Sequence, residues 1–174
     1  QYTVAGSAAK KNPFALIKNM LPAYTTAIGT QSSAATIPVT TQCTKNNGVS
    51  DGMAEFVCPL CATIHLSGST ITLTSCSIAV MMMMGQPITF GKMFPFILML
   101  GVTMVAAPGV PGGTVMASLG LITGVLMFDD AGTALMLAIF ALQDSFGTAC
   151  NVTGDGALTL MLTGYAEKHG IADT

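Results

Sequence analysis

Long apolar stretches of the chain are separated by short runs of glycine, proline and small polar residues. Residues 93–107 and 114–128 are apolar, and Pro108-Gly109-Val110-Pro111-Gly112-Gly113 separates them. Each stretch would form about 22 Å of helix, too short to cross roughly 30 Å of hydrocarbon. Proline removes a helix donor and glycine favours turns, so the pattern predicts a re-entrant hairpin over 91–128. A single kinked helix is the alternative, which two prolines and three glycines within six residues disfavour.

A second interruption of this kind lies nearer the beginning of the chain. Residues 12–29 are predicted to form a helix with an apolar face, and a small polar run from Thr30 to Thr36 follows it. Pro38 is then placed early in the next helix, so a first hairpin is expected over 12–46. Two interrupted apolar segments, one in each half, are typical of transporters that bind their substrate near the bilayer midplane.

The stretch between the two predicted hairpins, residues 51–84, is predicted to be a helix interrupted near Gly68. A break beside His65 would free backbone carbonyl groups that could bind an ion. Hydroxyl side chains also recur there at spacings of four, three, four and three, which predicts one helix face: Thr63, Ser67, Thr70, Thr74 and Ser77. Within an apolar segment such a face contacts protein or a cavity, and helix packing is the alternative to a binding role.

The last predicted helix, residues 131–166, carries polar residues on one face. Asp144, Thr148, Asn151 and Asp155 follow one another at spacings of four, three and four. A carboxylate at membrane depth costs about 2.5 kcal/mol or more, so such a residue normally faces the interior and binds a substrate or ion. Two carboxylates with an amide between them therefore predict a site for a cation and an ammonium group. Exposure of either aspartate to interfacial water is the alternative.

The composition is that of a membrane protein. Charged residues make up 8% of the 174 residues, whereas a soluble domain carries about 25%. This excludes a soluble enzyme domain, and the lack of a basic stripe excludes a nucleic-acid partner. All six bases are lysines: Lys10, Lys11, Lys18, Lys45, Lys92 and Lys168. Since lysine favours cytoplasmic ends, both ends of the chain are expected inside and the Lys92 loop outside.

The five cysteines do not predict a disulfide framework, because they are odd in number and lie in apolar surroundings. Cys58, Cys61 and His65 form a C-x2-C-x3-H pattern that could supply three zinc ligands. No fourth ligand lies nearby in the sequence, and Pro59 starts an apolar run. Packing of small residues is therefore favoured over zinc binding.

Three segments resemble the dicarboxylate/amino acid:cation symporters, the glutamate transporter family. Thr30-Gln31-Ser32-Ser33-Ala34-Ala35-Thr36-Ile37-Pro38 is similar to the tip of that family's first hairpin, and Ala106-Ala107-Pro108-Gly109-Val110-Pro111-Gly112-Gly113 to the tip of its second. The run from Asp144 to Asp155 is similar to its last helix. The resemblance covers residues 12–168 and only the C-terminal, substrate-carrying half of the family, so the chain is expected to be a fragment.

The resemblance implies an all-α membrane protein with two opposed re-entrant hairpins, one interrupted helix and one long polar helix. Together these would form a single transport domain over 1–174, which slides like an elevator against a trimeric scaffold. The second hairpin would be the outer gate and the first the inner gate. A small amino acid, the lipid bilayer and a homotrimer are the expected partners, and the cell membrane, favoured as a bacterial inner membrane, is the expected location.

The resemblance also implies roles for individual residues. Asp144 would hold the amino group of the substrate, and Thr148 and Asn151 its carboxylate. Ser33 and the backbone at Val110 would close over the substrate from the two tips. The full expected substrate set is Ser32, Ser33, Ser69, Val110, Asp144, Gly147, Thr148 and Asn151. A sodium site is implied at Cys61, His65, Asn151 and Asp155.

Departures from the family pattern bear on the substrate. Gly147 and Gln31 stand where members that carry acidic substrates place arginine, and the chain contains no arginine. Because a buried carboxylate needs a paired cation, a neutral amino acid such as serine, threonine or alanine is expected. An acidic amino acid or a C4-dicarboxylate is the alternative substrate.

A departure at His65 bears on the coupling ion, because His65 replaces a family asparagine that helps to bind sodium. Histidine can change its charge near physiological pH, so proton coupling is weighed against sodium coupling. A channel or a purely structural membrane subunit is the competing class of function. No enzyme is expected, since Cys61 and His65 are the only candidates for a nucleophile and base.

Overall fold

The computed structural model describes residues 1–171, and all of its regular elements are α-helices. They are α1 (Tyr2–Ala9), α2 (Pro13–Asn19), α3 (Leu21–Thr30), α4 (Ser33–Asn46), α5 (Asp51–Ile64), α6 (Ser67–Met83), α7 (Phe90–Met104), α8 (Gly113–Ala117), α9 (Leu119–Gly124) and α10 (Asp130–Lys168). No strand occurs within this described range. The all-α class is therefore confirmed, while residues 172–174 of the predicted domain lie outside the described residues.

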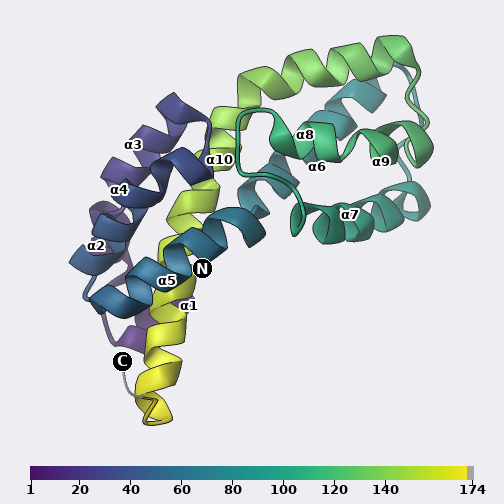
Figure 1. Cartoon of the computed structure of the whole chain (residues 1–174). Helices are drawn as coiled ribbons and strands as arrows, with labels where there is room; N and C mark the ends of the chain where they lie inside the picture. The colour runs from purple at the N-terminus through teal and green to yellow at the C-terminus, as the bar shows by residue number, and fades with distance from the viewer. Residues whose placement is uncertain (172–174) are drawn as a thin grey trace.

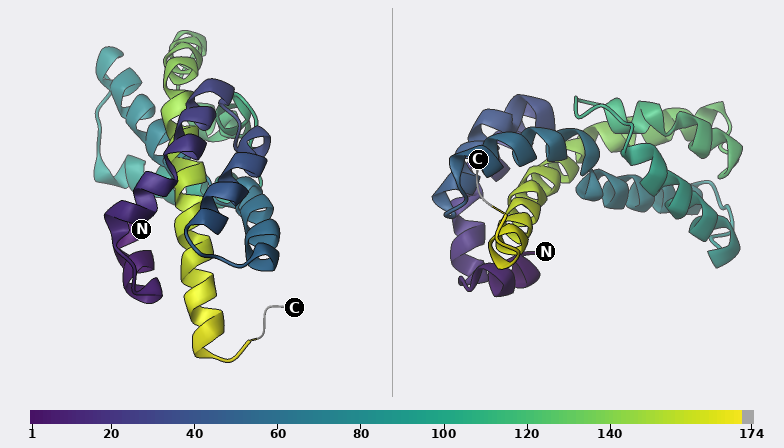
Figure 2. Two further views of the ribbon diagram at one scale, coloured as in Figure 1. Left: turned by 90° about the vertical axis from the view of Figure 1, so that its left-hand side faces the viewer. Right: turned by 60° about the horizontal axis from the view of Figure 1, so that its bottom comes forward.

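Helix α10, with 39 residues, is the axis around which the other helices are arranged. Helices α1 to α5 surround its C-terminal part, and α6 to α9 lie with its N-terminal part (Figure 1). The two groups of helices lie towards opposite ends of α10 (Figure 2). Asp129 starts α10 as its N-cap, because its carboxylate accepts a hydrogen bond of 2.8 Å from the N–H of Gly132.

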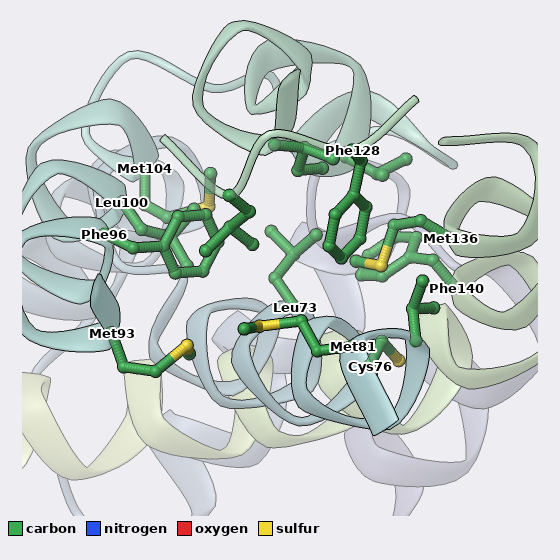
Figure 3. Close-up of a cluster of buried hydrophobic side chains, with 14 of the residues drawn as sticks. Leu73, Cys76, Met81, Met93, Phe96, Leu100, Met104, Phe128, Met136 and Phe140 are labelled. Carbon is green, nitrogen blue, oxygen red and sulfur yellow. The ribbon is translucent and has the colours of Figure 1, made fainter. Parts of the chain in front are cut away.

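The two groups of helices have different cores. The core around α1 to α5 uses small residues, which let helices approach closely: Ala5, Ala23, Ala27, Ala54, Ala149 and Ala157. The core around α6 to α9 is built from large, flexible or aromatic side chains, among them Phe96, Met104, Phe128, Met136 and Phe140 (Figure 3). Methionine is flexible and fills irregular gaps between helices.

The first predicted hairpin corresponds to α2, α3 and α4, with its turn at Gln31 and Ser32. Gln31 is left-handed at φ 50°, Ser32 is extended, and the Ser32 hydroxyl caps α4 by accepting the N–H of Ala35 at 3.1 Å. At the other end of α4, Lys45 bonds Glu55 at 2.7 Å and Asp51 at 3.0 Å. These bonds, the one to Glu55 first, raise the pKa of Lys45 above its ordinary value.

The predicted interrupted helix is present as α5 and α6, but the break lies at His65 and Leu66 rather than at Gly68. Gly68 is already the second residue of α6, and a Cβ there would collide with the carbonyl oxygen of Gly147. This glycine therefore allows a close helix approach instead of making the turn.

The break also divides the predicted hydroxyl face. The prediction that Thr63 shares this face is wrong, because Thr63 belongs to α5 and the other four residues to α6. Thr70 and Thr74 donate hydrogen bonds to carbonyl groups of their own helix, at 3.0 and 2.8 Å. Ser77 is buried and faces the sulfur of Met136 at 3.9 Å. These contacts favour the helix-packing alternative.

The second predicted hairpin corresponds to α7, an irregular loop over 105–112, and two short helices. A continuous helix over 114–128 was expected, and this is wrong, because Ser118 separates α8 from α9. The Ser118 hydroxyl donates to the carbonyl of Thr114 at 2.8 Å, and its N–H is shared between two carbonyls, which tightens the last turn of α8. After α9, Met127 is left-handed at φ 58° and leads the chain to the cap of α10.

Two helical stretches, Asp51–Met83 and Asp130–Lys168, are long and apolar enough to cross a membrane. Part of each lies buried inside the molecule, as in the core helices of soluble proteins. Length and composition alone are therefore weak support for the membrane prediction.

Candidate functional site

The tips of the two hairpins meet each other. The Ser32 hydroxyl donates to the carbonyl of Gly109 at 2.9 Å, and the N–H of Ala34 donates to the same oxygen at 3.1 Å. A Cβ on Gly109 would lie 2.5 Å from the carbonyl oxygen of Ala62 and 3.4 Å from Cβ of Ser33. The first tip, the end of α5 and the loop before α8 therefore come together in one place.

Asp144 of α10 contacts the second tip. Its Oδ2 accepts a hydrogen bond of 2.8 Å from the N–H of Gly112, and the residue is only 3% exposed. Gly112 has φ 70°, a left-handed conformation that glycine adopts without strain, and this conformation accompanies the contact between its N–H and the carboxylate. Within residues 1–171, Oδ1 of Asp144 accepts no hydrogen bond. The carboxylate thus has one oxygen occupied by the tip and one free to bind a ligand.

Asn151, about two helical turns further along α10 than Asp144, connects α10 to the start of α6. Its Oδ1 accepts the N–H groups of Gly68 at 2.8 Å and Ser69 at 3.2 Å, and its Nδ2 donates to the Ser69 hydroxyl at 2.9 Å. The N-cap of α6, Leu66, has no side chain that can satisfy these N–H groups. Asn151 therefore caps α6 from another helix, a role that the sequence did not indicate.

Gly147 lies where α10 crosses α6. A Cβ there would stand 2.9 Å from the hydroxyl of Thr72 and 3.3 Å from Cα of Ser69. On the other side of the crossing, Gly68 likewise has no room for a side chain. A side chain at position 147 would therefore have to displace the Thr72 hydroxyl or move the two helices slightly apart.

A second polar cluster lies at the helix break. Nδ1 of His65 is 2.8 Å from Oδ1 of Asp155, and Nε2 of His65 is 3.3 Å from the side-chain amide of Gln1. Asp155 is fully buried, and its Oδ2 has no hydrogen-bond partner among the described residues. An unpartnered buried carboxylate oxygen costs free energy, so this oxygen is the atom of the cluster that a bound cation would stabilise.

The C-x2-C-x3-H pattern, for which packing was favoured over zinc binding, does not gather a set of metal ligands. Over the described range, no group of three or more His, Cys, Asp or Glu side chains could hold a metal ion. Cys61 contributes its carbonyl oxygen to the N–H of His65 at 2.8 Å, and Cys58 is buried with its sulfur 3.5 Å from the hydroxyl of Thr44. Cys58 and Cys61 are therefore buried as small apolar residues.

Six of the predicted substrate residues lie at two neighbouring places in the structure. Ser32, Ser33 and Asp144 lie where the two tips meet α10, and Ser69, Gly147 and Asn151 lie at the crossing of α6 and α10. Thr148 is buried on the same face of α10, and Val110 is half exposed, with its carbonyl accepting the N–H of Gly113 at 2.9 Å.

The glycines of the second tip were predicted to set its backbone geometry, but not to make particular backbone contacts. Gly109 supplies its carbonyl oxygen to the first tip and Gly112 its N–H to Asp144. Their position in the Pro/Gly-rich tip was the only signal in the sequence, because a backbone group leaves no mark in the residue type. The predicted sodium residues are also divided, since Asn151 bonds α6 while His65 bonds Asp155.

Comparison with known proteins points to one family of transporters. The sequence pattern of the sodium:dicarboxylate symporter family matches residues 1–165. A neutral amino acid transporter B(0) of Macaca fascicularis is 28% identical over 166 residues, which are 95% of this chain and 30% of that protein. An excitatory amino acid transporter of Caenorhabditis elegans is 32% identical over 152 residues, 84% of this chain and 29% of that protein. Excitatory amino acid transporter 1 of Homo sapiens is 31% identical over 152 residues, 84% of this chain and 27% of that protein.

The chain thus spans about 30% of the length of the curated relatives that it matches. These relatives are named for two kinds of substrate, neutral and excitatory amino acids, at similar identity. The comparison therefore does not choose between the two substrate classes, and the residues of the site have to do so.

Proposed function

Because the chain belongs to the sodium:dicarboxylate symporter family, we propose that it is the substrate-binding part of a secondary symporter for a small amino acid. One observation carries this proposal: two hairpin tips meet beside a buried carboxylate, Asp144, and one of them donates a backbone N–H to it. A site enclosed by two opposed turns can open on either side of a membrane, as alternating access requires.

Binding would proceed through charge-assisted hydrogen bonds. The ammonium group of the substrate would bind the free oxygen of Asp144, while Gly112 keeps the other oxygen. The substrate carboxylate would accept hydrogen bonds from the Thr148 hydroxyl, from the remaining N–H of the Asn151 amide, and from Ser33 at the first tip. These groups lie on both sides of the place where the tips meet, so the substrate would hold them together.

We extend the proposal to sodium as the coupled ion. The unpartnered Oδ2 of Asp155 would be its charged ligand. Carbonyl oxygens freed at the break between α5 and α6, near His65 and beyond Cys61, whose own carbonyl accepts the N–H of His65, would complete the site. Uptake into vesicles under an imposed sodium gradient, at equal pH inside and outside, tests this. Uptake driven by a pH gradient without sodium would contradict it and favour the proton alternative.

The structure of the helix crossing supports a neutral substrate. A side chain at Gly147 would crowd Thr72 and Ser69 of α6, and the chain has no arginine to neutralise a substrate's side-chain carboxylate. An acidic substrate would then carry an unpaired buried charge, which is strongly unfavourable. Competition between serine and aspartate for uptake in the same vesicles tests the preference for a neutral substrate. Tighter binding of aspartate than of serine would contradict it.

The remaining features of the proposal follow from the resemblance and the length of the relatives. The hairpins over 12–46 and 91–128 would be re-entrant, and residues 1–174 would form one transport domain of a longer membrane protein. This domain would move like an elevator against a scaffold formed by the rest of that protein, as a homotrimer.

The function is tested by counterflow of labelled amino acid into proteoliposomes that contain the full-length protein. A symporter exchanges internal for external amino acid with saturable kinetics and leaves it chemically unchanged. Asp144→Asn and protein-free liposomes serve as controls. Flux without saturation would indicate a channel, and a chemically altered amino acid would indicate an enzyme, so either result contradicts the proposal.

A further inference from the structure

A second polar pocket lies at the base of the first hairpin, at the end of α4 that is remote from the Ser32 tip. It has a volume of about 360 Å³, and its polar lining consists of Lys11, Asn12, Asn19, Asn46 and Asn47. Helix α4 has 14 residues, so roughly 20 Å of helix separate this pocket from the tip. None of these residues belongs to the proposed substrate or sodium site.

Hydrogen bonds between the pocket residues fix its walls. Nδ2 of Asn47 donates to the carbonyl of Leu16 at 3.1 Å, and its Oδ1 accepts from the amide of Asn19 at 2.8 Å. The Lys11 ammonium donates to the backbone carbonyl of Asn47 at 2.6 Å. It lies against Gly48, where a Cβ would collide with it. Lys11 is an exposed residue, and its nitrogen is held at the pocket by this bond to the backbone.

The side-chain oxygens of this lining are largely used already. Oδ1 of Asn12 caps α2 by accepting the N–H of Phe14 at 3.0 Å, and Oδ1 of Asn46 accepts from the amide of Gln42 at 3.1 Å. The oxygen of Asn47 is bonded to Asn19, as described above. What the lining offers to a ligand is therefore a set of N–H donors: the amide groups of Asn12 and Asn46, and the Lys11 ammonium.

The charge around the pocket is positive. Lys11 is the one charged residue of its lining, and no carboxylate of the described residues lies within salt-bridge distance of Lys11. By contrast, Asp51 and Glu55 neutralise Lys45. Glu167 lines an adjoining cavity of about 40 Å³ with Lys11, and it is followed by Lys168. A lining rich in donors and positive charge suits an anionic ligand and disfavours an amine.

We propose that this pocket binds a phosphate group, supplied either by the headgroup of an anionic phospholipid or by free phosphate. Phosphate oxygens act as acceptors, which matches the donors of Lys11, Asn12 and Asn46. Basic pockets between helices at a membrane surface are suited to lipid headgroups. This inference is independent of the substrate site, and it holds whether or not the proposed transport activity is correct.

The test uses the full-length protein in detergent, titrated in separate experiments with phosphatidylglycerol and with inorganic phosphate, and monitored by native mass spectrometry. The informative variant is Asn12→Asp, which keeps the oxygen that caps α2 but replaces the amide donor by a negative charge. We expect its affinity for both ligands to fall about tenfold, because a like charge now faces the phosphate. The matched control is Gln86→Glu, which adds the same charge beside Lys92, far along the chain.

Loss of affinity in Asn12→Asp with unchanged affinity in Gln86→Glu supports the site. The ligand that binds the unmodified protein at the lower concentration identifies the source of the phosphate. Equal affinity of wild type and Asn12→Asp for both ligands overturns the proposal, as does binding of neither ligand by the wild type. Thermal unfolding of Asn12→Asp at or above the wild-type temperature excludes misfolding as the cause of a loss.

Discussion

The two hairpins share one plan, an interrupted pair of helices with its tip at α10, but they are held in different ways. The first turns over two residues, Gln31 and Ser32, and its arms are α2 with α3 on one side and the continuous α4 on the other. The second turns over residues 105–112 and returns through α8 and α9, neither of which exceeds six residues. The core of the first is richer in alanine, and the core of the second is richer in methionine and phenylalanine.

The bonds at the tips show what this difference means. The first tip is stabilised within itself: the Ser32 hydroxyl caps α4, and the hydroxyl of Thr36 donates to the Ser32 carbonyl at 2.8 Å. Among the described contacts, the second tip is tied to its surroundings by Gly109, which bonds the first hairpin, and by Gly112, which bonds Asp144. A substrate at Asp144 would change the second set of bonds directly. We infer that the second hairpin is the one that moves on binding.

The largest effect is expected from Asp144→Asn. The amide keeps an oxygen that can accept the Gly112 N–H, so the tip contact persists, but the charge that would bind an ammonium group is lost. We expect substrate binding to weaken at least about tenfold, on the order of 1.4 kcal/mol, with little change in the unfolding temperature. Equilibrium titration with labelled amino acid measures this, and an unchanged affinity would place the amino group elsewhere.

A smaller effect is expected from Gly112→Val in the second tip. No atom lies within 4 Å of a Cβ at this position, so the cost is backbone strain at φ 70° rather than a clash. Left-handed geometry costs a residue with a side chain roughly 1–2 kcal/mol, which corresponds to about fivefold or more. We expect transport to slow by about this factor while equilibrium binding changes less.

The control for this variant is Gly101→Val in α7, which also meets no atom within 4 Å but has no positive φ. It should leave transport close to that of the wild type. If Gly112→Val reduced binding and transport equally, the second tip would be a structural element and the comparison between the hairpins would fail.

The smallest effect on transport is expected from Ser32→Ala in the first tip. It removes the cap of α4 and the bond to Gly109, and loss of such a cap costs about 1 kcal/mol of stability. Because the arms of this hairpin stay packed on α10, we expect a lower unfolding temperature but a transport rate above that of Gly112→Val. Ser50→Ala, which removes the cap of α5 away from the tips, is the matched control. A transport loss in Ser32→Ala larger than in Gly112→Val would reverse the assignment of the moving tip.

The spacing of residues along the sequence was sufficient to predict the features that depend on a single helix. The spacing of Asp144, Thr148, Asn151 and Asp155 predicted a common face, and all four are buried in the structure. The interruptions near Ser32 and Pro108 were also predictable, because glycine, proline and small polar residues act on the local backbone.

Features that depend on contacts between distant segments could not be predicted. Gly68 marked the region of the break, but its own role is set by Gly147, which lies on another helix. Asn151 was expected to be a ligand, yet it also caps α6, whose own sequence has no cap. The division of the last arm at Ser118 depends on a hydroxyl-to-backbone bond that helix propensity does not reveal.

The most direct test of this account is hydrogen–deuterium exchange of the full-length protein, with and without saturating amino acid and sodium. The exchange of residues 105–113 is compared with that of residues 30–36. The account predicts that the substrate slows exchange mainly in 105–113, because this tip is tied to Asp144, while 30–36 changes little. Equal protection of both tips, or protection confined to 30–36, would contradict it.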